Sequence, residues 1–126
     1  MDKIVKRDGA IVSFDANKIE TAILKAAKVT KEFGEKEAAN VTRKVVLMAQ
    51  EIANKKESNL KAPTVEEVQD AVEVALYSFG YTATAKAYIL YREERNKVRN
   101  KNSALMQSIS EKITASNVQN QNANMD

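Results

Sequence analysis

Cysteine and histidine are both absent from this chain of 126 residues. Their absence excludes disulfide bonds, thiolate and imidazole metal ligands, cysteine nucleophiles and histidine general bases. Paired carboxylates or a lysine remain available for catalysis, but the acidic residues follow the spacing of helix surfaces and form no pattern typical of a catalytic pocket. We therefore expect a chain that is not itself an enzyme and that has neither catalytic residues nor a metal site of its own.

Residues that interrupt helices are also scarce, with one proline and three glycines, and tryptophan is absent. Since 44% of the residues are hydrophobic and only 6% are aromatic, the core must consist mainly of Ala, Val, Ile and Leu, which is typical of close-packed helices. No apolar run is long enough to cross a bilayer, and the first residues lack the layout of a secretory signal. We expect one mainly helical domain, cytoplasmic and without a membrane partner.

The charge balance is slightly basic, with a net charge of +3 and a pI near 9.1. This excess favours anionic partners but is too small to specify a nucleic acid, and phosphate on a small molecule fits equally well. There is no Gly-rich Walker loop and no Gly-x-Gly-x-x-Gly motif, which excludes a conventional nucleotide-binding fold. A phosphate site in this chain would be of another kind.

The first residues predict a β-hairpin. Two short β-prone runs flank Asp8 and Gly9, and an Asp-Gly pair between such runs is a strong hairpin signal. We place strands near residues 3–7 and 10–14. Because a hairpin of two strands is barely stable alone, it should lie as a lid over a helical core.

Four helices follow in the predicted order. Asp15 is a natural N-cap for the first helix, which extends to about Val29, and a second helix after Gly34 ends among residues 54–56. Thr64 and Glu67 have the layout of a capping box at the start of a third helix. Its predicted buried stripe comprises Val65, Val68, Val72, Ala75 and Phe79.

Gly80 ends the third helix, and a fourth is predicted from about Thr82 to Asn100, burying Ala85, Ile89 and parts of Tyr88 and Tyr91. A helical period continues over residues 105–113, either as a separate segment or as an extension of the fourth helix. From Ser116 onward the chain is rich in Asn and Gln and is expected to be a linker. We expect the chain to be a piece of a longer protein.

Two groups of residues are candidates for binding. Lys6 and Arg7 beside the hairpin turn and Lys18 in the first turn of the next helix could converge on phosphate, because phosphate needs N–H donors and positive charge. On the fourth helix, Tyr88 and Arg92 are four residues apart and could stack a base and hold phosphate. Spacing alone favours the other interpretation, in which the cations lie in solvent and the tyrosines pack inward.

The ordered combination of motifs is more specific than each motif. Residues 5–9 (Val-Lys-Arg-Asp-Gly), 14–15 (Phe-Asp), 17–19 (Asn-Lys-Ile), 63–73 (from Pro-Thr-Val-Glu-Glu-Val) and 85–92 (Ala-Lys-Ala-Tyr-Ile-Leu-Tyr-Arg) resemble the ATP-cone signature in order. The resemblance covers residues 3–100. Residues 101–126 would be a helical extension and a linker toward an absent catalytic domain. Residues 120–126 resemble the Asn-rich stretch of anaerobic, glycyl-radical ribonucleotide reductases. The other common owner of such a cone, a transcriptional repressor, carries a Cys-rich zinc ribbon that this chain lacks.

The resemblance implies a four-helix core covered by an N-terminal β-hairpin lid, in a domain that binds ATP as activator and dATP as inhibitor, together with Mg²⁺. It implies that Lys6, Arg7 and Lys18 contact the phosphates. Residues implied to wall the adenosine are Ile4, Phe14 and Ile19. Further implied contacts are Asp15, which caps its helix, Thr64, Lys86, Tyr88, Tyr91 and Arg92. Family members often have an acidic or polar residue where this chain has Val12, so no ribose or metal contact is expected there.

The implied partners are ATP or dATP, the catalytic domain of the same parent chain and, in the parent, further copies of that chain in a homo-oligomer. No nucleic acid is expected. One alternative is a basic helical module that binds nucleic acid through residues Arg92, Arg95, Lys97, Arg99 and Lys101. A second is a helical interaction domain without a ligand. Neither alternative accounts for the cations of the hairpin.

Overall fold

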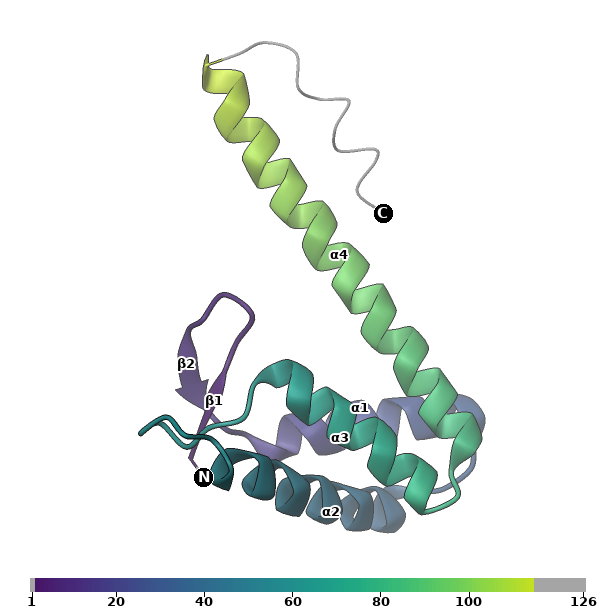
Figure 1. The fold of residues 1–126 in the computed structure, drawn as a ribbon. Coiled ribbons are helices and arrows are strands. Elements are labelled where there is room, and N and C mark those ends of the chain that lie inside the picture. Colours follow the sequence, from purple (N-terminus) through teal and green to yellow (C-terminus); the bar gives the residue numbers. More distant parts are fainter. Residues whose placement is uncertain (1, 115–126) are drawn as a thin grey trace. The chain divides into compact units, whose positions relative to one another are not determined.

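The computed structural model describes residues 2–114, and side chains over residues 2–98. The predicted linker from Ser116 and the Asn-rich residues 120–126 lie outside this range. The described elements follow the predicted order (Figure 1): β1 (Lys3–Val5), β2 (Ile11–Ser13), α1 (Ala16–Thr30), α2 (Glu35–Asn54), α3 (Val65–Ser78) and α4 (Thr82–Thr114). The fold is mainly helical with one N-terminal hairpin, as predicted. The chain divides into two units, Met1–Ile89 and Leu90–Asp126.

The hairpin is antiparallel, with Ile4 opposite Val12 at its centre. The N–H of Gly9 donates to the carbonyl of Lys6 at 2.9 Å, and the Asp8 carboxylate accepts from the N–H of Ala10 at 2.9 Å. Gly9 has φ +87°, in the left-handed region that disfavours residues with a Cβ. The Asp-Gly pair therefore forms the predicted turn, although the strands are shorter than expected.

β1 is attached to the segment that enters α3. The N–H of Val5 donates to the carbonyl of Pro63 at 2.9 Å, and Val5 and Thr64 form a parallel bridge. In Figure 1 the purple strands accordingly lie beside the first turn of α3. Ile4 and Phe14 pack against the edge of the helical core, which gives the hairpin the apolar support that two strands lack alone.

Small aliphatic side chains fill the core of the first unit. Alanine contacts let helix axes approach closely, and the larger side chains fill the space between them. The fully or nearly fully buried members are Ile23, Ala26, Ala38, Val41, Val45, Ala49, Val68, Ala71, Val72, Ala75, Leu76, Ala85 and Tyr88. The helices that support the hairpin are thus held by burial of aliphatic surface.

Helix ends follow local signals in the sequence. The Asp15 carboxylate accepts from the N–H of Asn17 at 3.0 Å and caps α1. Lys31 ends α1 in the left-handed conformation, and Gly80, with φ +84°, ends the turn after α3. Thr64 and Glu67 form the predicted capping box. The caps at Asp15 and Thr64 confirm the predicted starts of α1 and α3.

One detail of the predicted buried stripe is wrong. Phe79 is not part of the buried stripe of α3, because it is the C-cap residue and is 43% exposed, with its ring stacked on Tyr81 at 6.1 Å. Ala71 and Leu76 are buried on α3 instead. The fourth helix continues past Asn100 to Thr114, since no glycine or proline interrupts it, so residues 105–113 extend this helix and form no separate segment.

Candidate functional site

A pocket of about 410 Å³ lies between the hairpin turn and the first turn of α3. Each of the two elements supplies part of the lining. The hydrogen bond from the Val5 N–H to the Pro63 carbonyl holds the end of β1 beside the start of α3. The residues that line the pocket are Val5, Lys6, Arg7, Thr64, Val65 and Glu66. The structure therefore brings three predicted site residues together: Lys6, Arg7 and Thr64.

The two cations of the hairpin turn differ in their surroundings. Lys6 is exposed, and its backbone N–H donates to the carbonyl of Ala10 at 2.8 Å, so the turn holds its backbone. Arg7 forms an ion pair with Glu66 of α3, with Nη2 2.5 Å from Oε1. The Arg7 side chain is 34% exposed and that of Glu66 is 47% exposed. Both charges therefore remain accessible from solvent.

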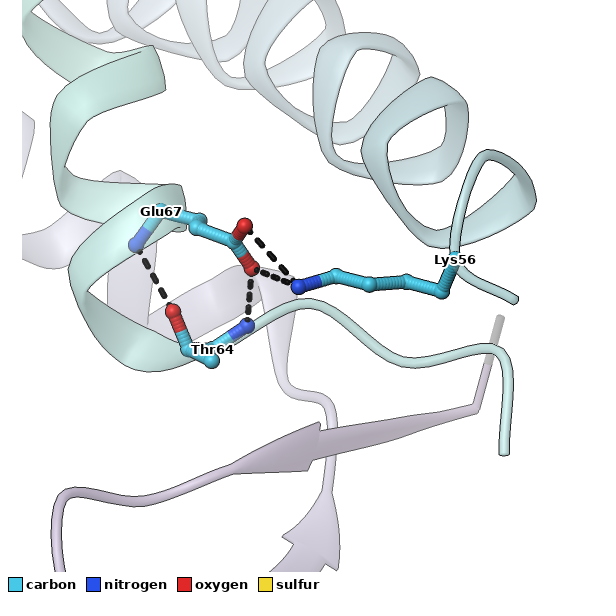
Figure 2. A network of polar contacts seen from close by, with 3 residues as sticks. All are labelled: Lys56, Thr64 and Glu67. Carbon is cyan, nitrogen blue, oxygen red and sulfur yellow. Dashed lines mark hydrogen bonds and ion pairs between the residues drawn. The ribbon is translucent and has the colours of Figure 1, made fainter. Parts of the chain in front are cut away.

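The first turn of α3 is fixed by a network of three side chains and the helix backbone (Figure 2). Thr64 Oγ1 accepts from the N–H of Glu67 at 3.1 Å, and the Glu67 carboxylate accepts from the N–H of Thr64 at 2.8 Å. Lys56 Nζ lies 2.8 Å from the same Glu67 oxygen, Oε1, and 2.9 Å from Oε2. The network joins the end of α2 to the start of α3.

Partial burial raises the pKa of Glu67, but the hydrogen bond from Lys56 and the hydrogen bond from the Thr64 N–H outweigh it. The pKa of Glu67 consequently lies below its ordinary value. Glu67 is therefore ionised at neutral pH, and its charge is favourably placed at the N-terminus of α3. Thr64 acts here as a cap, and its side chain is committed to that role.

The other predicted phosphate contact, Lys18, is exposed in the first turn of α1 and does not line the pocket. Its N–H donates to the carbonyl of Asp15 at 3.2 Å. Asp15 is exposed, and its cap of α1 is the contact that the structure describes for it. The three residues predicted to wall the adenosine, Ile4, Phe14 and Ile19, are partly buried and pack on the core.

The predicted residues of α4 belong to different surroundings. Lys86 is exposed, whereas Tyr88 is only 5% exposed and is a member of the core. Tyr91 and Arg92, both partly buried, belong to the second unit. There the Arg95 guanidinium lies over the Tyr91 ring, 5.8 Å from its centroid. One face of the Tyr91 ring is thus covered by a cation of its own helix.

Two features were missed by the sequence reasoning. Glu66 lines the pocket, although its only sequence signal was its place beside the capping residues. The second is a polar network at the start of α4, where fully buried Thr84 donates through its N–H and its hydroxyl to Glu32 Oε1, at 2.8 and 2.6 Å. The hydrogen bond from the Thr84 side chain is the main reason that the pKa of Glu32 is lowered.

The described residues contain no cluster of three or more Asp, Glu, His or Cys residues able to hold a metal ion. Over the same residues, no helix combines the length and the apolar composition needed to cross a bilayer. The only carboxylate in the pocket lining is that of Glu66. The arrangement offers an anion two cationic side chains beside the N-terminus of a helix, where the first backbone N–H groups have no partner within the helix.

Comparison with known proteins identifies the family of the chain. The chain is 33% identical to the anaerobic ribonucleoside-triphosphate reductase of Escherichia coli over 98% of its own length and 16% of that protein. It is 39% identical to the vitamin B12-dependent ribonucleoside-diphosphate reductase of Thermoplasma acidophilum over 77% of its length and 12% of that protein. The chain therefore spans less than a fifth of these relatives. Residues 2–97 match the family described as the ATP cone domain, and the chain belongs to the ATP-cone family.

Proposed function

We propose that this chain is a regulatory domain that binds ATP or dATP and controls the activity of a ribonucleotide reductase of the anaerobic, glycyl-radical class. The observation that carries the proposal is the pocket between the hairpin turn and α3, where Lys6 and Arg7 stand beside the N-terminus of a helix in a chain of the ATP-cone family. Mobile positive charge, a planar guanidinium and backbone N–H donors are each suited to binding phosphate oxygens.

In the proposed complex, the polyphosphate binds at Lys6 and Arg7, and Lys18 approaches it from α1. Arg7 offers a planar fork that matches two phosphate oxygens, and Lys6 contributes a mobile point charge. Thr64 keeps the first turn of α3 in place through its cap. Val65 and Glu66, the first two residues of α3, line the pocket, and the first N–H groups of a helix have no partner within the helix itself.

The base and the sugar are assigned to the apolar residues under the hairpin. Ile4, Phe14 and Ile19 are partly buried at the edge of the core, so each has apolar surface left to cover a nucleoside. Tyr88 is buried in the core, and its burial favours a role in packing over direct contact with the ligand. Lys86, Tyr91 and Arg92 remain assigned to the ligand, as does Asp15 beside its cap.

Magnesium is expected to arrive with the nucleotide. Since the described residues hold no cluster of metal ligands, the phosphates themselves would supply most of its ligands. The ion would neutralise part of the polyphosphate charge. The protein residues would orient the nucleotide through Lys6 and Arg7.

The regulatory role concerns the parent protein. The chain matches only a small part of much longer reductases. On this basis we propose that the parent protein also contains a catalytic domain and forms a homo-oligomer. ATP would favour the active state and dATP the inactive state. A ligand that bound the active and inactive states equally would not shift the equilibrium between them. The two nucleotides must therefore differ in their contacts near the 2′ position of the ribose.

Calorimetric titration of ATP, dATP and GTP with Mg²⁺ into the full chain tests the proposal. The Lys6→Ala/Arg7→Ala variant is compared with Arg43→Ala/Lys44→Ala, which removes an adjacent arginine and lysine, both exposed, from α2 outside the pocket. We expect binding of the adenine nucleotides to the wild type and to the α2 variant, and its loss in the hairpin variant. Absence of heat with every nucleotide in a folded wild-type chain would refute the proposal.

A further inference from the structure

The pocket that would receive a polyphosphate carries a negative charge of its own. Glu66 lies in its lining together with Lys6 and Arg7, and its Oε1 is 2.5 Å from Arg7 Nη2. Carboxylate and phosphate oxygens accept from the same guanidinium donors. A phosphate that approaches Arg7 from the pocket therefore meets a carboxylate that already contacts one of the guanidinium nitrogens, Nη2.

We propose that Glu66 is an internal competitor of the bound polyphosphate and sets the affinity of the pocket for it. This inference rests on the proposed function, because it concerns the same site. In the free chain the Glu66 carboxylate holds the Arg7 guanidinium, and binding exchanges this carboxylate for phosphate oxygens. In the free state Glu66 neutralises the positive charge of Arg7. The ion pair must therefore break before Arg7 can bind the nucleotide, and breaking it weakens nucleotide binding.

The exposure of the pair makes this exchange feasible. With side chains 34% and 47% exposed, both charges are partly solvated, and an ion pair at such a partly exposed site is weak. A group carrying several negative charges can therefore displace a single carboxylate.

Glu66 is not needed to start the helix on which it lies. The capping box of α3 uses Thr64 and Glu67, and the bond to Lys56 also goes to Glu67. Neutralising Glu66 leaves both cap hydrogen bonds in place. A change in nucleotide affinity after substitution of Glu66 is therefore separable from loss of the first turn of α3.

The test is calorimetric titration of ATP into Glu66→Gln, in Mg²⁺ and in EDTA, beside Glu51→Gln as a control of equal charge on the exposed face of α2. Loss of the competitor should tighten ATP binding roughly three- to tenfold, and higher salt should reduce this gain. Glu51→Gln should bind as the wild type does.

Glu66→Asp separates competition for Arg7 from simple repulsion. It keeps the negative charge but is shorter by one methylene group, so it reaches Arg7 less well. Competition predicts that this variant also binds ATP more tightly than the wild type. Affinity of Glu66→Asp equal to that of the wild type would show repulsion alone and would overturn the proposal.

The remaining outcomes are equally distinct. If Glu66→Gln binds ATP as the wild type does, or more weakly in Mg²⁺ because the carboxylate is a ligand of the ion, the competitor is disproved while the proposed function stands. If the folded wild type binds no nucleotide, the proposed function itself fails. Circular dichroism of each variant confirms that the helices are intact before the affinities are compared.

Discussion

Replacement of Thr84 by valine tests the network that fastens the start of α4 to the end of α1. Thr84 is fully buried, and its Oγ1 lies 2.6 Å from Glu32 Oε1 and 2.7 Å from Thr30 Oγ1. An ionised carboxylate only accepts, so the Thr84 hydroxyl donates to Glu32. The hydroxyl of Thr30 must then donate to Thr84. Valine has a similar shape but removes both hydrogen bonds.

The expected loss of unfolding free energy depends on which hydrogen bonds Glu32 and Thr30 keep in the variant. Glu32 keeps the bond from the Thr84 N–H at 2.8 Å and is exposed to water, whereas the Thr30 hydroxyl falls back on the Ala27 carbonyl, 3.3 Å away. Neither partner is left wholly unsatisfied, so we expect Thr84→Val to lower the free energy of unfolding by about 1–2 kcal/mol. For a domain of this size the melting temperature should fall by roughly 4–12 °C.

Thermal and urea denaturation followed by circular dichroism provide the assay, with Thr42→Val as the control. Thr42 is also buried, but its hydroxyl donates to the Ala38 carbonyl of its own helix at 2.8 Å. In an α-helix the Ala38 carbonyl also accepts from the Thr42 N–H, so it keeps a partner when the Thr42 hydroxyl is removed. Thr42→Val should therefore lower the free energy of unfolding much less than Thr84→Val does. Equal destabilisation by the two substitutions would refute the assignment of a tertiary role to Thr84.

The same variant should change the dependence of stability on pH. The pKa of Glu32 is lowered from 4.5, first by the hydrogen bond from the Thr84 side chain. A lowered folded pKa contributes stability above the unfolded value, and that contribution is lost as the pH falls through the folded pKa. The difference in stability between wild type and Thr84→Val should therefore narrow as the pH is lowered below about 4.5. A difference that stays constant from pH 7 to pH 3 would contradict this linkage.

Two further predictions concern the turn and the core. Gly9→Ala places a Cβ at φ +87°, where nothing lies within 4 Å of it, so only backbone strain of about 1 kcal/mol should appear in urea denaturation. A neutral result would show that the turn adopts another conformation. Val72→Ala removes two methyl groups from a side chain that is 1% exposed and should cost about 2 kcal/mol, whereas Val74→Ala, at a site that is 54% exposed, should change the unfolding free energy by less than about 0.5 kcal/mol. Similar losses for both valines would contradict the assigned face of α3.

Local chemistry allowed the sequence to predict most of the secondary structure. The turn at Asp8 and Gly9, the cap at Asp15 and the capping box of Thr64 and Glu67 each depend on residues within a few positions of one another, and each forms as predicted. The prediction failed at Phe79, where the helical period was extended one residue past the last turn of α3. Periodicity marks a face of a helix but does not show where that helix stops burying it.

Contacts between distant segments were decided by the tertiary structure alone. The Arg7 and Glu66 ion pair and the bonds of Thr84 to Glu32 join residues that no spacing rule relates, and they exist only because the packed helices bring their ends together. Lys56, at the end of α2, meets Glu67 in the same way. The sequence by itself determined which residues could carry charge and start helices. Only the packing of the aliphatic core decided which of those charges face one another, since burial of apolar surface is not directional and specifies no particular polar pair.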